Sequence, residues 1–133
     1  MMRVRLSVTA VTAAMVLAVA PARAAVETIV AGPGSQALGS FATPLVVARQ
    51  GAAVTFLNQD VQPHGVVSTA KGPSTQPWCG FFAEDSCPLL WAPVTDAGGR
   101  TSLLRGMSNT SAGEVYGLFC PIHPSVIGRL AVV

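Results

Sequence analysis

Charged side chains are scarce in this sequence. Only 11% of its 133 residues are charged, whereas charged residues make up about a quarter of a typical soluble domain. So low a fraction excludes a disordered charged tail, a long charged helix and a coiled coil. No stretch gathers the basic residues that a nucleic-acid-binding surface needs, so the sequence predicts no nucleic-acid partner.

Long apolar runs are also scarce, and the one that stands out lies at the N-terminus. A basic start, an apolar run of about 15 residues and the small residues around Arg23 are typical of a secretory signal. An uncleaved membrane anchor is the alternative, but a spanning helix needs about 20 apolar residues. We predict cleavage after Ala24, which leaves residues 25–133 as an extracytoplasmic protein, periplasmic or secreted, without a membrane span. Three of the eight basic residues leave with the signal, and five remain against six acidic residues.

The rest of the chain lacks long helical patterns. No segment of 11 or more residues has convincing 3.6-residue periodicity, and glycine and proline interrupt the chain frequently. Short β-branched runs are typical of strands instead, and they cover residues 26–30, 42–49, 52–58, 65–69, 101–105, 115–120 and 128–133. This pattern predicts a single all-β domain, an antiparallel β-sandwich.

Residues 70–99 interrupt the strand pattern. They contain four prolines, four glycines, both tryptophans and two of the three cysteines. A connection this long without secondary structure is generally functional or cross-linked. We predict a disulfide between Cys79 and Cys87, which enclose seven residues; two free thiols or a metal-binding pair are the alternatives. The loop either extends a docking surface or packs as a cover over the sandwich.

A disulfide there leaves Cys120 as the one unpaired cysteine. Cys120 and His123 are three residues apart in FCPIHPSV (119–126), and the only other histidine, His64, lies in NQDVQPHG (58–65). Each lies where a predicted strand meets a proline-containing turn, and a sandwich can bring such strand ends to one pole. One thiolate and two imidazoles are the soft, trigonal donor set of copper electron-transfer sites. Taken singly, a cysteine or histidine of this kind is more often a buried structural residue than a ligand, and the case for a site depends on the three together.

Two stretches of the sequence resemble the cupredoxins, the small blue copper proteins, especially the plastocyanin and amicyanin type. VVARQGAAVTFLN (46–58), continued to His64, is similar to the strand–turn–strand that leads to that family's first copper histidine. Residues 116–132, with Cys120 and His123 followed by proline, are similar to its C-terminal ligand loop and last strand. The resemblance covers most of residues 40–133 outside the 70–99 loop. It implies a Greek-key sandwich in which His64, Cys120 and His123 bind one copper ion.

The sequence departs from the family pattern at two positions. The family's weak axial methionine comes three residues after its second histidine, where this chain has Val126, which cannot coordinate. The implied site is three-coordinate or receives a distant backbone oxygen near Pro63. Met107, the one methionine in residues 25–133, is a less favoured surrogate for the axial ligand. Without the soft sulfur donor we expect a higher reduction potential than in a methionine-ligated relative. Gly65 replaces an asparagine that often follows the first histidine, and it offers only its N–H to the thiolate.

The resemblance implies a non-enzymatic electron carrier. A monomer would exchange single electrons with transient redox partners that dock through a small interface around His123. The expected docking surface consists of Ile122, Pro124, Ser125 and Val126.

Two other functions use the same residues. An extracytoplasmic copper-binding or delivery protein without electron transfer is the main alternative, and the scarcity of methionine disfavours it. Catalytic zinc is the second alternative. It also needs a proton-transfer group nearby, and the nearest acidic residue in sequence, Asp60, is four residues from His64.

Overall fold

A computed structural model describes residues 11–14 and 27–133 of the chain. The predicted signal segment and its cleavage site fall largely outside these residues. In the part of the chain that is described, no helix combines the length and apolar character needed to cross a membrane.

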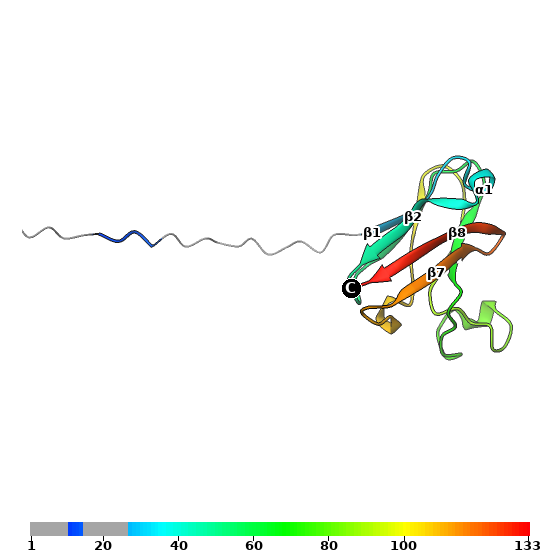
Figure 1. Ribbon diagram of the computed structural model, residues 1–133. Coiled ribbons are helices and arrows are strands. Elements are labelled where there is room, and N and C mark those ends of the chain that lie inside the picture. Colours follow the sequence, from blue (N-terminus) through cyan, green and yellow to red (C-terminus); the bar gives the residue numbers. More distant parts are fainter. Residues whose placement is uncertain (1–10, 15–26) are drawn as a thin grey trace, which may run out of the picture.

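The described residues form two β-sheets that face each other across an apolar core (Figure 1). The strands are β1 (Glu27–Ala31), β2 (Ser40–Ala48), β3 (Val54–Asn58), β4 (His64–Ser68), β5 (Trp91–Thr95), β6 (Arg100–Leu103), β7 (Val115–Cys120) and β8 (His123–Val132). One α-helical turn, α1 (Ser35–Leu38), and two short 3-10 helices, Cys79–Phe81 and Met107–Asn109, complete the fold. The all-β sandwich predicted from the sequence is confirmed.

One sheet has the strand order β1-β3-β6 and the other the order β2-β8-β7-β4-β5. Neighbouring strands are antiparallel except for β1 with β3 and β2 with β8, which run parallel. Each parallel pair joins strands that are distant in sequence, so local sequence patterns do not predict the pairing or its direction. In the larger sheet β4, β7 and β8 are adjacent, which places the start of β4, the end of β7 and the start of β8 at one end.

The core uses alternate residues of the strands. In β7, Leu118 and Cys120 are buried, whereas Val115 on the opposite face is exposed. This decides which face of the 115–120 strand points inward, a question that its two-sided apolar sequence left open. In β3 the inward residues are Val54 and Phe56. The two sheets therefore bury alternating apolar side chains against each other, as a β-sandwich requires.

The expected loop of residues 70–99 contains a strand that the sequence analysis did not predict. β5 pairs with β4 in antiparallel register, with Thr95 opposite His64 and Trp91 opposite Val67. Pro93 argued against a strand here, because proline is generally found only on edge strands. In the structure β5 is an edge strand, so it accommodates Pro93. The irregular part of the connection is thus confined to the residues between β4 and β5.

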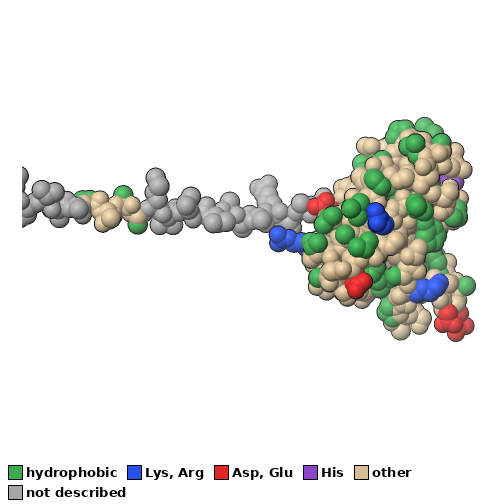
Figure 2. All heavy atoms as spheres, in the orientation of Figure 1, with side chains coloured by type: hydrophobic (Ala, Val, Ile, Leu, Met, Phe, Trp, Pro, Cys, Tyr) green, Lys and Arg blue, Asp and Glu red, His purple; other side chains and the backbone are tan. Residues whose placement is uncertain are grey.

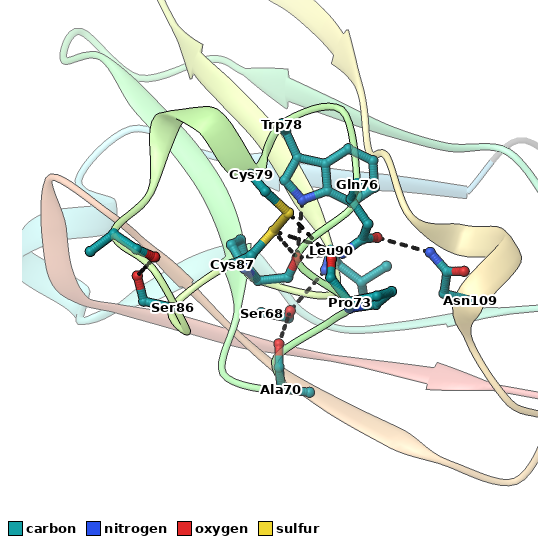
Figure 3. Close-up of a disulfide and its surroundings, with 12 residues drawn as sticks. Ser68, Ala70, Pro73, Gln76, Trp78, Cys79, Ser86, Cys87, Leu90 and Asn109 are labelled. Carbon is teal, nitrogen blue, oxygen red and sulfur yellow. Dashed lines mark hydrogen bonds between the residues drawn. A yellow bond between two sulfur atoms is a disulfide. The ribbon is translucent and has the colours of Figure 1, made fainter.

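This shorter connection is closed by the predicted disulfide, Cys79–Cys87 (Figure 3). The indole N–H of Trp78 and the side-chain amide of Gln76 both donate to the carbonyl of Pro88, beside the disulfide. Trp78 is buried, whereas Phe81 is 78% exposed. The loop is therefore partly a cover over the sheet and partly an exposed aromatic surface.

Candidate metal centre

The ends of three adjacent strands carry the two histidines and the unpaired cysteine. His64 is the first residue of β4, Cys120 the last of β7 and His123 the first of β8. Cys120 and His123 pair with each other across the two-residue turn formed by Pro121 and Ile122. In Figure 1 this β7–β8 turn lies at the right, at the opposite end of β8 from the C-terminus.

The three side chains converge on one point. Their potential ligand atoms all lie within 4.8 Å of one another. The Sγ of Cys120 is 3.8 Å from the Nδ1 of His123, and the two imidazole rings have centroids 4.9 Å apart. His64 and Cys120 are fully buried, and His123 is half-buried. The structure thus brings together the three residues that the sequence singled out.

A polar atom without a partner marks the centre of this cluster. Among the residues that the structure describes, the Nδ1 of His64 is the one buried side-chain nitrogen or oxygen that has no hydrogen-bond partner. Buried polar atoms are normally satisfied, so such an atom requires an explanation. A metal ion between this nitrogen, the thiol sulfur and the second imidazole would satisfy it. The residues present therefore fit a metal ion.

The other ring nitrogen of His64 is bound to Asp60, a contact that the sequence analysis did not predict. The Nε2 of His64 lies 2.8 Å from Asp60 Oδ2, and both side chains are buried. Asp60 Oδ1 accepts backbone N–H groups from Val61 at 2.8 Å and Gly34 at 3.4 Å. Burial alone would raise the pKa of the Asp60 carboxyl, but these hydrogen bonds, led by the one from His64, hold that pKa below its usual value.

Gly65 sits between the cysteine and strand β5. Its backbone N–H points to the Sγ of Cys120 at a distance of 3.5 Å, as the sequence analysis expected. A Cβ atom at this position would lie 3.1 Å from the backbone nitrogen of Val94 and 3.2 Å from the backbone oxygen of Ala92. Glycine therefore allows β5 to pass close to the start of β4, where the register of the two strands shifts.

Val126, which stands at the family's axial position, and Met107, the surrogate ligand considered, both lie in the core. Val126 is fully buried, so it cannot belong to the exposed docking surface in which the sequence analysis placed it. Its place in β8 explains this, because its side chain points inward with that of Leu130. Met107 is the first residue of the 3-10 helix Met107–Asn109, and Thr110 follows that helix. The side chain of Gln50 donates to the carbonyl of Thr110, and its backbone N–H donates to the carbonyl of Val133. Met107 therefore lies near the C-terminal end of β8, far from His123.

The surface around His123 is apolar. Ile122 is 47% exposed, and Leu38 and Val61 are exposed still further. Leu38 belongs to α1, which adjoins this end because Gly39 lies against the backbone of Ser125. Figure 2 shows hydrophobic side chains spread over the face of the folded part that it presents, with few Lys, Arg, Asp or Glu side chains between them.

Comparison with known proteins identifies the fold. No protein-family model and no curated protein sequence matches the chain. A purple cupredoxin from Nitrosopumilus maritimus has 19% identity, covers 80% of this chain and 99% of its own, and superposes with a TM-score of 0.56. A variant of amicyanin in its Cu(I) form has 22% identity over 81% of this chain and 82% of its own, with a TM-score of 0.54. A reduced form of another amicyanin variant has 22% identity, covers 87% of each chain and gives a TM-score of 0.54. The sandwich of two sheets, with His64, Cys120 and His123 together at one end, has the cupredoxin fold that the two sequence motifs predicted.

Proposed function

We propose that this protein is an exported electron carrier that holds one copper ion between His64, Cys120 and His123. The observation that supports this most directly is the unpartnered Nδ1 of His64, which faces a thiol and a second imidazole in a buried site. One thiolate and two imidazoles are the donors of blue copper centres. The resemblance of the fold to amicyanin and to a purple cupredoxin supports the same assignment.

Bound copper would supply a one-electron couple, and the chain itself supplies a rigid setting for it. Cys120 and His123 are fixed by the β7–β8 pairing, and His64 is fixed by β4 and by Asp60. Because strand ends rather than a mobile loop hold the donors, we expect little movement between the two oxidation states. The half-buried His123 would lead electrons to the apolar surface formed by Leu38, Val61, Ile122 and Pro124, where partners dock transiently.

The visible absorption spectrum of the copper-loaded, oxidised protein tests this proposal. We expect an intense charge-transfer band from Cys120 to copper, lost in Cys120→Ala and kept in Met107→Leu, which alters a buried residue at the far end. A copper-loaded protein without this band would contradict the assignment. Reversible one-electron voltammetry separates a carrier from a copper-delivery protein, which would instead lose its copper rapidly to a weak chelator.

A further inference from the structure

The hydrogen bond between Asp60 and His64 determines which nitrogen of His64 faces the site. An ionised carboxylate can only accept hydrogen bonds, and the neighbours of Asp60 Oδ1 are backbone N–H groups, which can only donate. The hydrogen bonds to Asp60 hold its pKa below the usual value, so the carboxyl is ionised. The Nε2 of His64, 2.8 Å from Oδ2, then carries the proton. In the neutral ring Nδ1 then keeps its lone pair, and it faces Cys120 and His123 without a hydrogen-bond partner.

Asp60 is itself held in place. Its backbone N–H donates to the side-chain oxygen of Asn58 at 3.0 Å. The side-chain amide of Asn58, which is fully buried, donates to the carbonyls of Gln62 and Thr95 at 2.8 and 2.9 Å. Thr95 is the β5 residue paired with His64. The turn that carries Asp60 is thus tied to the two strands beside the site, so the carboxylate is a fixed part of the centre.

The charge of Asp60 changes the balance between the two oxidation states. A Cu(I) ion with one thiolate and two neutral imidazoles has no net charge, whereas the Cu(II) form carries one positive charge. Adding the Asp60 carboxylate makes the Cu(II) form neutral and leaves the Cu(I) form with one negative charge. A buried net charge is unfavourable, and in the described part of the chain no lysine or arginine lies within ion-pair distance of Asp60.

We propose that Asp60 is a positioning residue that fixes the Nε2–H tautomer of His64 and that its buried negative charge lowers the reduction potential of the site. This rests on the proposed copper function. The effect opposes the rise expected from the absence of an axial methionine at Val126. A carboxylate bound to a ligating histidine also increases the basicity of the ligand, which favours the more highly charged metal ion.

Two substitutions of Asp60 separate its geometry from its charge. Asp60→Asn keeps an oxygen that can accept from His64 but removes the charge, so we expect the tautomer to be kept and the potential to rise. The ratio of Cu(II) to Cu(I) affinity should fall about tenfold, which corresponds to about 59 mV for one electron. Asp60→Ala removes both features and leaves the His64 Nε2–H without its acceptor, so the affinity for Zn²⁺ should also fall by about 10–100-fold.

The matched control is Asp96→Asn. Asp96 follows Thr95 at the same end of the molecule but is exposed, so solvent screens its charge. We expect its removal to leave the potential almost unchanged. An equal shift in both variants would indicate a general surface-charge effect and would overturn the proposal, as would an unchanged potential in Asp60→Asn.

Nitrogen NMR of the metal-free protein tests the positioning role without copper. Long-range proton–nitrogen correlations should show His64 protonated at Nε2 in the wild type and in Asp60→Asn, and a mixture of tautomers in Asp60→Ala. A wild-type ring protonated at Nδ1 would overturn the positioning role. If the copper-loaded wild type has no charge-transfer band, the proposed function and the effect on potential fail together. The NMR result and the Zn²⁺ affinity then still decide whether Asp60 positions His64.

Discussion

At the scale of single residues, we expect Val126 and Asp60 to act on the proposed copper site in opposite directions. Val126 stands where the cupredoxin pattern has a soft sulfur donor, and an apolar residue there should favour the less charged Cu(I). Asp60 accepts a hydrogen bond from the buried His64, and its negative charge should favour Cu(II). The potential of the site therefore depends on the sum of both, and each term can be measured separately.

The first prediction concerns Val126. We expect Val126→Met to lower the reduction potential, because a thioether near the metal stabilises Cu(II) relative to an apolar wall. The larger side chain enters a fully buried position, so stability should also fall, by about 1–3 kcal/mol. Spectroelectrochemical titration measures the potential. An unchanged or higher potential, with the charge-transfer band intact, would contradict the prediction.

At the scale of elements, β5 passes close to the start of β4 at Gly65, the residue whose N–H points to the thiol of Cys120. The register of the two strands shifts between His64 and Val66, and Gly65 lies at the shift. Its N–H is directed at Cys120 while the backbone of β5 occupies the space that a side chain would need. Substitutions at this position should therefore affect both stability and the metal site.

The second prediction compares two glycines. Gly65→Ala should destabilise the metal-free protein by about 1–3 kcal/mol, because its Cβ meets the backbone of β5. It should also shift the charge-transfer band, since the N–H moves relative to Cys120. Gly80→Ala is the matched control, because a Cβ there meets no atom within 4 Å. Denaturant titration of both variants checks the prediction, and an equally small loss in both would refute it.

The third prediction separates the disulfide loop from the metal site. The chain-entropy model assigns a stabilisation of about 2.5 kcal/mol to a bridge that encloses so short a segment. Replacing both Cys79 and Cys87 by alanine should lower the free energy of unfolding by about this amount. The loop leaves β4 after Ser68, at the far end of the strand from His64, so the visible spectrum should not change. A lost or shifted band in the double variant would show that the loop supports the site.

At the scale of the whole molecule, the end that carries the candidate metal site is almost without exposed charge on the segments nearest to His123. Residues 34–39, 60–63 and 121–125 include a single charged side chain, Asp60, and it is buried. Exposed apolar side chains of α1 and of the β7–β8 turn flank His123. Such a surface suits brief contacts that depend little on ionic strength.

The fourth prediction concerns this surface. In Ile122→Lys, two copies that meet through this end would each present a positive charge, so electron self-exchange should slow at least tenfold and become faster with added salt. Line broadening in NMR spectra of mixtures of the oxidised and reduced protein measures the rate. Arg129→Ala, at an exposed position further along β8, is the control. An unchanged rate in Ile122→Lys would place the electron-exchange surface elsewhere.

The sequence by itself determined which donors are available and that the domain is a β-sandwich. The chain has two histidines and, once Cys79 pairs with Cys87, one unpaired cysteine, and the resemblance to the cupredoxins implied that these three residues are the ligands. The short β-branched runs located most of the strands. Those are local properties, readable from residue type and spacing. The strand β5 was not predicted because it contains Pro93, and proline is tolerated only in strands at the edge of a sheet. Sequence patterns do not show which strand lies at the edge.

Only the tertiary structure decided how the donors are oriented and what surrounds them. That Asp60 holds Nε2 of His64, that Val126 points into the core and that Met107 lies at the opposite end all depend on strand pairing over long separations. Sequence spacing gives no information about such contacts, because the chain's path between them is set by the packing of the whole sandwich. The candidate ligands could therefore be named from the sequence, whereas the hydrogen bonds and the burial around them depend on the fold.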